Sequence, residues 1–367
     1  MKVIIVGAGI YGLSAALRLA ELGHQVEVVD RGAIPHPHSS SFDYHRLIRH
    51  AYGSQQGYAN LIPAAFGAWD RLWKNLGVSH YIQTGCLALG SKSAGWIRQS
   101  IQSLDQMEID YQVLNHGQVA ESFPWLKMAT EEEALFTTEG GILLARKILE
   151  SISIQLASLG VGLHSHTEIE SIDFERSVVR GRDRTSYHGD FILCALGAGH
   201  TRFFPGEIIP IRQVYSLIDD APQFATIEHG CPMILDISDE GGFYFVPGSS
   251  AFPVKIGDHL SRLQGIPYSL EEITDLDRKH IQSISNTRLS PDWAKPSRFG
   301  VCYYSCTPDN AIQFESGDTH AKIYGGSGHG FKFGALFGEL IADVITGKRK
   351  SADASRIISG AAPAKNL

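Results

Sequence analysis

The sequence predicts a two-domain α/β protein, in which a domain with a parallel sheet is interrupted by a domain built on an antiparallel sheet. Residues 2–30 have the pattern of a strand, a glycine-rich turn, a helix and a second strand. A second glycine-rich strand–turn–helix pattern lies at residues 321–346, and residues 210–300 alternate between apolar and polar positions with frequent turns. The chain has 367 residues, and since a domain usually has roughly 100–200 residues, two domains are expected.

The N-terminal elements follow from the spacing of apolar residues. Residues 3–6 form a β-branched run typical of a buried parallel strand, and residues 13–22 have the apolar spacing of a helix that Gly23 caps. Residues 25–29 are predicted as the second strand, which ends before Asp30. The twenty residues after Asp30 are rich in proline and serine and are predicted to be a loop.

The later elements and the domain boundaries are assigned in the same way. Helices are predicted at residues 57–76, 142–159 (opened by Gly140 and Gly141) and 331–346, and strands at 86–89, 167–174, 186–194, 233–237, 242–246, 252–257 and 321–324. The parallel-sheet domain is therefore expected to be discontinuous. It would comprise residues 1–80, 141–212 and 300–367, and the antiparallel domain residues 81–140 and 213–299.

The turn after the first strand carries the spacing Gly7-x-Gly9-x-x-Gly12. Glycines here permit a tight turn and a close approach of the backbone to a pyrophosphate, and the following helix N-terminus supplies unpaired N–H groups. Asp30 ends the second strand, where a carboxylate can accept hydrogen bonds from ribose hydroxyls. This context predicts a bound dinucleotide, and the alternative is a glycine-rich turn kept for packing.

The order of the elements distinguishes between two dinucleotides. In an NAD-dependent dehydrogenase, strands and helices usually alternate until the parallel sheet is complete. Here the alternation breaks after Asp30 and resumes only near residue 142. Since glycine-rich turns occur near both chain ends, a longer cofactor contacted by both ends, namely FAD, is favoured.

Composition and charge exclude several classes of partner. The formal net charge is −7 without a long basic run, so a nucleic-acid or anionic-membrane partner is not expected. The sequence contains no stretch of about 18 uncharged apolar residues, so no membrane-spanning segment is expected. The five cysteines are too scattered for a disulfide framework, which predicts a cytoplasmic protein. His36-Pro37-His38 lacks further ligands nearby, so it is interpreted as a loop and no metal site is predicted.

Three segments resemble one family of flavoproteins over essentially the whole chain. Residues 46–53 (RLIRHAYG), 302–309 (CYYSCTPD) and 328–333 (GHGFKF) are similar, in order and spacing, to motifs of monomeric sarcosine oxidase and N-methyltryptophan oxidase. Residues 209–213 (IPIRQ) extend the resemblance. It implies an FAD-dependent amine oxidase of the D-amino-acid-oxidase superfamily, with a fold like that of p-hydroxybenzoate hydroxylase. Family members are often monomeric, which implies a monomer or a weak oligomer.

The resemblance implies a role for each matching residue. Arg49 and Lys332 match the residues that bind the substrate carboxylate, and Lys255 matches the lysine that activates oxygen beside the flavin. His259 and Tyr304 match pocket positions, and Tyr244 is expected to line the same pocket. The alternatives are a phosphate or surface contact for Arg49, a solvated helix face for Lys332, and a structural role for His259.

The resemblance also implies the contacts of the cofactor. Cys302 matches the cysteine that bonds the flavin 8α-methyl group through sulfur, although a free cysteine is more often buried and inert. Cys306 lies four residues further along the same predicted strand. The residues expected to contact FAD are Gly7, Gly9, Ile10, Tyr11, Gly12, Asp30, Arg31, Ser40, Arg46, Gly197, Cys302, Gly328, His329, Gly330, Phe331 and Lys332.

The implied activity is oxidation of a secondary or primary amino acid at its C–N bond. A hydride passes to FAD, the imine hydrolyses, and O2 is reduced to H2O2, so the partners are a small carboxylate-bearing amine and O2. The alternatives are an FAD-dependent dehydrogenase that passes electrons to a quinone or a protein, and a non-catalytic flavin-binding protein. Two departures from the family pattern, at residues 43–45 (DYH) and 310–315 (NAIQFE), leave the identity of the substrate open.

Overall fold

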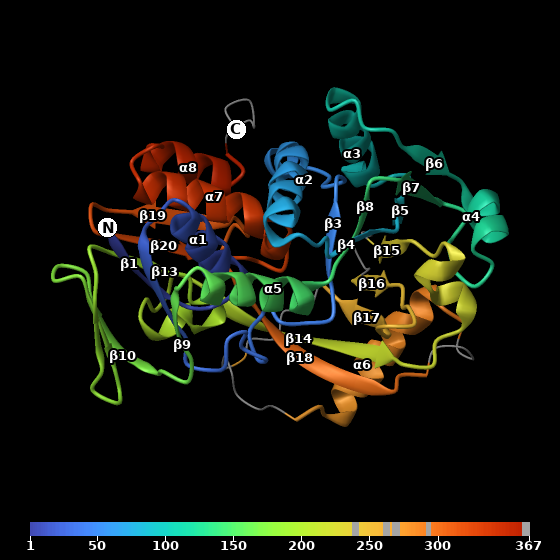
Figure 1. Ribbon diagram of the computed structural model, residues 1–367. Helices are drawn as coiled ribbons and strands as arrows, with labels where there is room; N and C mark the ends of the chain where they lie inside the picture. Colours follow the sequence, from blue (N-terminus) through green and yellow to red (C-terminus); the bar gives the residue numbers. More distant parts are fainter. Residues whose placement is uncertain (237–241, 260–264, 266–271, 291–294, 362–367) are drawn as a thin grey trace.

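Two large sheets, one mostly parallel and one mostly antiparallel, organise the chain (Figure 1). The computed structural model describes residues 1–236, 242–259, 265, 272–290 and 295–361. Its α-helices are α1 (Ile10–Glu21), α2 (Gln56–Leu76), α3 (Gly95–Gln106), α4 (His116–Ser122), α5 (Ala145–Ser158), α6 (Asp275–Arg288), α7 (Gly334–Ile345) and α8 (Ser351–Ile358). The predicted helix at residues 57–76 is confirmed as α2.

The mostly parallel sheet has six strands. In order across the sheet they are β19 (Gln313–Ser316), β20 (His320–Tyr324), β13 (Phe191–Cys194), β1 (Lys2–Val6), β2 (Gln25–Val29) and β9 (Gly162–His164). Only the edge strand β19 runs antiparallel to its neighbour. The predicted parallel sheet, with glycine-rich turns near both chain ends, is thereby confirmed.

Both faces of this sheet are covered, which explains the unbroken apolar run in β1. Val3 and Ile5 belong to the same core cluster as residues of α1, α5 and α7. Ile4 and Val6 pack on the opposite side, against the three-stranded sheet of β10 (Ile169–Asp173), β11 (Val178–Gly181) and β12 (Ser186–His188). Side chains alternate between the faces of a strand, so each face of β1 needs its own apolar residues.

The mostly antiparallel sheet has eight strands. In order they are β18 (Arg298–Cys306), β14 (Ile209–Ile218), β17 (Val254–Asp258), β16 (Phe243–Val246), β15 (Met233–Asp236), β5 (Cys86–Ser91), β7 (Glu132–Thr137) and β6 (Gln112–Leu114). The single parallel pair, β5 with β15, joins two segments distant in sequence. The division into two domains stays a proposal. Two strands of this sheet, β14 and β18, cross the expected domain boundaries near residues 212 and 300.

A second three-stranded sheet carries Arg46 and Arg49, two of the three predicted site arginines. It has the order β3 (Arg46–Arg49), β8 (Gly140–Leu143) and β4 (Tyr81–Gln83), and Figure 1 shows β3 between α2 and the eight-stranded sheet. Arg46 lies opposite Leu143, and Arg49 lies opposite Gly140. This pairing places both arginines on a strand rather than in a loop.

Three predictions of secondary structure were wrong in part. The loop after Asp30 contains β3, and the helix predicted from residue 142 begins at Ala145, because residues 140–143 pair with β3 and β4 instead. The strand predicted at residues 186–194 is two strands of different sheets, separated at Gly189, where a side chain would meet the Lys2 carbonyl oxygen at 2.9 Å. The end of the strand predicted at residues 233–237 lies outside the described residues.

None of the helices within the described ranges has the length and apolar composition needed to cross a membrane.

Candidate active site

The turn between β1 and α1 can be built only with glycine at two positions. Gly7 has φ +109°, and a Cβ there would lie 2.3 Å from the Ala195 carbonyl oxygen. A Cβ at Gly12 would lie 1.9 Å from the Gly7 carbonyl oxygen. The backbone therefore packs closely at both positions, and Gly9, Ile10 and Tyr11 at the α1 N-terminus line a cavity, which suits a pyrophosphate.

Asp30 is tied to this turn at the end of β2. Its Oδ2 accepts a hydrogen bond from Ala8 N at 2.8 Å, and its Oδ1 accepts one from Gly32 N at 2.9 Å. Asp30 also lines the groove described next. The carboxylate therefore fixes the glycine-rich turn in this structure, and its bond to a ribose stays a prediction.

A chain of three connected cavities follows the turn. The first, about 260 Å³, and the second, about 120 Å³, share Gly7, Asp30, Ser39 and Leu196 in their walls. The second and the third, about 310 Å³, share Arg46, Tyr304, Gly328 and Phe331. Every predicted FAD contact except Gly12 lines one of these cavities, and so do all six predicted catalytic residues. The sequence prediction thus identified residues that the fold brings together along one elongated groove.

The glycine-rich turns near the two ends of the chain lie in contact at Tyr11 and Gly330. A Cβ at Gly330 would lie 2.0 Å from the Tyr11 hydroxyl oxygen, while the next Tyr11 atom, Cζ, would be 3.1 Å away. The Tyr11 hydroxyl is buried and has no hydrogen-bond partner among the described residues. A polar group buried in this way is available to a ligand in the groove.

Gly330→Ala is therefore expected to destabilise the protein by about 1–3 kcal/mol, the usual cost of overpacking. Since the closest contact is with the Tyr11 hydroxyl, adding Tyr11→Phe should restore most of the lost free energy of unfolding. The measurement is the free energy of unfolding in urea for the wild type, both single variants and the double variant. A double variant no more stable than Gly330→Ala would show that Tyr11 is not what excludes a side chain here.

A buried carboxylate, Asp43, joins two of the predicted site cations. It accepts hydrogen bonds from Lys255 and from Arg46, and Arg46 also donates to the Ser40 carbonyl at 2.7 Å. Burial opposes ionisation of Asp43, but these cations outweigh burial and hold the pKa of its carboxyl well below the usual range. Lys255 Nζ also lies 4.0 Å from the centre of the Tyr215 ring. Arg46 and Lys255 are thus paired cations with fixed positions.

Arg49 and Lys332 differ from this pair, because neither has an acidic partner within the part of the chain that the structure describes. Among the residues that the structure describes, Arg49 Nη1 is buried without a hydrogen-bond acceptor, and Lys332 Nζ donates to the His329 carbonyl alone, at 3.3 Å. Burial, followed by the nearby Arg49 charge, holds the pKa of Lys332 well below its usual range. Two such cations in one cavity wall form a site for an anion.

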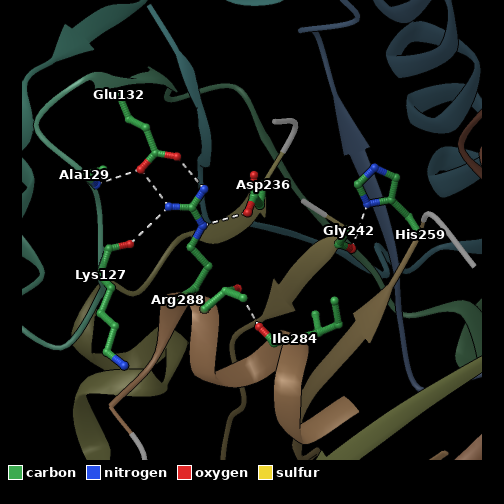
Figure 2. Close-up of polar contacts among 9 residues, drawn as sticks. Lys127, Ala129, Glu132, Asp236, Gly242, His259, Ile284 and Arg288 are labelled. Atoms are coloured by element: carbon green, nitrogen blue, oxygen red, sulfur yellow. Dashed lines mark hydrogen bonds and ion pairs between the residues drawn. The ribbon is translucent and has the colours of Figure 1, made fainter. Parts of the chain in front are cut away.

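The cavity also holds three histidines that burial keeps neutral. Burial lowers the pKa of His45 to about 4 and that of His329 to about 3. Burial also lowers the pKa of His259, whose Nδ1 donates to the Gly242 carbonyl at 2.8 Å (Figure 2). The neutral His259 ring keeps Nε2 as a hydrogen-bond acceptor.

A buried arginine cluster supports the wall that Leu235 contributes to the cavity (Figure 2). Arg288, at the end of α6, donates from Nε to Asp236 at 2.7 Å and from Nη2 to Glu132 at 2.6 Å. Asp236 follows Leu235 directly in β15. The cluster therefore ties α6, β7 and β15 together beside the cavity, and truncating one charge would leave the others buried and unpaired.

Cys302 lies in β18 and lines the cavity of about 310 Å³, as does Cys306 four residues later. Burial raises the pKa of Cys302, while the nearby Arg46 and Lys255 charges oppose that shift. The net effect favours the thiol over the thiolate, and the two cations lessen that preference without reversing it.

A family model described as FAD dependent oxidoreductase (DAO) matches residues 2–344. The chain belongs to the DAO family of FAD-dependent oxidoreductases. It is 23% identical to monomeric sarcosine oxidase of Bacillus sp. (strain NS-129), with 96% of this chain and 95% of that protein covered. It is also 23% identical to N-methyl-L-tryptophan oxidase of Yersinia pestis (strain Pestoides F), with 92% and 93% covered. The predicted family and its FAD dependence are confirmed.

Solved structures show the same fold. NikD, described as an unusual amino acid oxidase essential for nikkomycin biosynthesis, has a TM-score of 0.81 at 19% identity, with 100% of this chain and 98% of that chain covered. Fructosyl amine:oxygen oxidoreductase (Amadoriase I) from Aspergillus fumigatus has a TM-score of 0.78 at 19% identity, with 95% and 87% covered. The predicted fold class is confirmed.

The groove of this DAO-family chain fits FAD in its glycine-rich turn, in the walls that its three cavities share, and in a Tyr11 hydroxyl that has no hydrogen-bond partner among the described residues. The sequence analysis missed several cavity residues, namely Gln55, Gln213, Leu235, Val246, Asn310 and Ser327. Their residue types did not mark them as cavity residues, because neutral polar and aliphatic residues are common throughout the chain. The partnership of Asp43 with Lys255 was also missed, since it joins positions 212 residues apart.

Proposed function

We propose that the protein oxidises the CH–NH bond of a secondary or primary amino acid and reduces O2 to H2O2. The observation that carries the proposal is the pair Arg49 and Lys332, which line the cavity at one end of the FAD groove without an acidic partner among the described residues. The names of the relatives support it, since monomeric sarcosine oxidase and N-methyl-L-tryptophan oxidase are oxidases of N-alkyl amino acids.

The two cations would bind and orient the substrate carboxylate. A planar guanidinium can donate two parallel hydrogen bonds to a carboxylate, and an ammonium adds a compact charge. Burial of Lys332 strengthens this interaction, because few water molecules compete for the anion. Binding an anion would also raise the depressed pKa of Lys332 toward its usual value.

The reaction does not require a strong base from the protein. When bound, FAD would supply the acceptor for the hydride and, in its reduced form, the two electrons that reduce O2 to H2O2. No Asp or Glu is among the described residues that line the cavity, and its three histidines have lowered pKa values. These residues suit a substrate amine that arrives neutral, with His259 Nε2 available to accept a hydrogen bond from its N–H.

Lys255 would serve the reduction of O2. A fixed cation stabilises the negative charge that develops on oxygen, and a site preorganised in this way needs no rearrangement during the reaction. The ion pair with Asp43 and the ring of Tyr215 hold the ammonium at the cavity wall. We also propose a cytoplasmic location, which fits the finding that none of the five cysteines, all of them within the described residues, forms a disulfide.

The function is tested by mixing the FAD-loaded protein without oxygen with N-methyl, cyclic and primary amino acids. Loss of the flavin absorbance with one class, followed by peroxide formation when air is admitted, is the expected result. A flavin that bleaches but is not reoxidised by air would favour the dehydrogenase. A flavin that no amino acid bleaches would favour a non-catalytic flavin-binding protein.

Cys302 is the proposed attachment point of FAD, through a thioether to the 8α-methyl group. Acid-precipitated wild-type protein is expected to stay yellow, whereas Cys302→Ser should release the flavin into the supernatant. Cys306→Ser is the matched control, since Cys306 lines the same cavity on the same strand. A colourless wild-type pellet would contradict attachment and leave FAD binding intact.

A further inference from the structure

Helix α3 contacts the segment after β3 through two residues one turn apart, Trp96 and Ser100. The Trp96 ring centre lies 5.8 Å from Arg49 Cζ, and the Tyr52 ring centre lies 4.5 Å from the same atom. Both distances are within the range of an attractive contact between a guanidinium and an aromatic ring. We infer that Trp96 is a positioning residue, which together with Tyr52 fixes the Arg49 guanidinium for binding the substrate carboxylate. This inference rests on the proposed function.

The approach of Trp96 depends on a glycine. Gly53 has φ +59°, and a Cβ there would lie 2.3 Å from Trp96 Cδ1. The Gly53 N–H donates a hydrogen bond to Ser100 Oγ at 2.8 Å, and Ser100 is fully buried. The chain between Arg49 and Gly53 is therefore held by α3 at two points, one through an indole ring and one through a hydroxyl.

The helix that supplies these contacts is itself firmly packed. Ile97 and Leu104, one and zero percent exposed, lie in one apolar cluster with Ala51, Ala88 and Leu135. Ala88 belongs to β5 and Leu135 to β7, so the cluster connects α3 to the eight-stranded sheet. The position of Arg49 is thus set from the proposed substrate domain, although Arg49 lies on a strand outside that domain.

Trp96 acts through Arg49, because it is absent from the cavity wall that Arg49 lines. The contacts with the two rings use no hydrogen-bond acceptor, and Arg49 Nη1 has none among the described residues, so Nη1 is left to donate to a carboxylate. Because the Arg49 side chain is already held in place, little of its conformational entropy is lost when a carboxylate binds. Trp96 should therefore affect the affinity for carboxylates and leave the rate at saturating substrate unchanged.

The test measures acetate binding to the FAD-loaded protein at constant ionic strength, by calorimetry and by the change in flavin absorbance. Trp96→Leu is expected to raise the Kd of acetate between about 2-fold and about 30-fold, and Trp96→Phe by less. KM for the amino acid should rise in parallel while kcat stays constant. The matched control is Trp125→Leu, a tryptophan that packs on Phe245 away from this cavity, which should leave the acetate Kd unchanged.

Arg49→Gln separates the inference from the proposed function. If Arg49→Gln weakens acetate binding and Trp96→Leu, folded and FAD-loaded, does not, the role of Trp96 is overturned and the carboxylate site stands. If Arg49→Gln leaves acetate binding unchanged, the carboxylate site itself is wrong. In the Arg49→Gln background, Trp96→Leu should have no further effect, and a full additional loss would contradict positioning through Arg49. Should Trp96→Leu fail to fold, Trp96→Phe with an unchanged acetate Kd overturns the inference.

Discussion

Lys255→Met is expected to slow the reaction of the reduced protein with O2 by about 10²- to 10³-fold, the usual cost of removing one preorganised electrostatic contact. Reduction by substrate without oxygen should change little, since Arg49 and Lys332 remain. Methionine has a similar length and no charge, and Asp43 keeps Arg46 as its partner. The variant should therefore fold while losing only the cation at the cavity wall.

The two half-reactions are measured separately by stopped-flow absorbance of the flavin. Lys322→Met is the matched control, because Lys322 pairs with Glu207 and Glu315 and does not line the groove. Reoxidation at the wild-type rate in Lys255→Met would refute the role of Lys255. Slow reoxidation of the wild type itself would favour the dehydrogenase alternative.

Arg49→Gln is expected to raise the Kd of the substrate carboxylate by about 10²- to 10³-fold, because truncating one member of a buried charge pair costs about 2–5 kcal/mol. Arg49→Lys should fall between the wild type and Arg49→Gln, since lysine keeps the charge and loses the two parallel N–H donors. The Kd comes from the dependence of the flavin reduction rate on substrate concentration.

An analogue of the substrate in which an amide replaces the carboxylate provides the control for this prediction. Its weak binding should be nearly the same in the wild type and in Arg49→Gln. Arg71→Gln is the matched protein control, because Arg71 forms a surface pair with Glu339 and lies away from the cavity. An equal loss of affinity for the acid and the amide would show that Arg49 does not recognise the carboxylate.

The sequence was sufficient to predict the glycine-rich turn, because Gly7 and Gly12 are required by backbone contacts within a single strand–turn–helix unit. Arg49 and Lys332 could be identified because they lie in motifs that resemble a family. The strand at residues 140–143 was missed, since a short apolar run has no periodicity that distinguishes a strand from the start of a helix.

The interactions that set the properties of the site could not be predicted from local sequence. Asp43 contacts Lys255, and Trp96 contacts Arg49, only when segments distant in sequence have packed together. No helix was predicted at residues 95–106, and nothing in their sequence indicates a contact between Trp96 and a distant arginine. Tertiary contacts of this kind become visible only in the folded structure.

The groove takes its walls from residues near both chain ends, including Gly7 and Gly330. A ribosome therefore releases the last wall only after residues up to Gly330 have emerged. The complete groove cannot form on a shorter nascent chain, so a chain cut before Gly330 should bind FAD weakly or not at all.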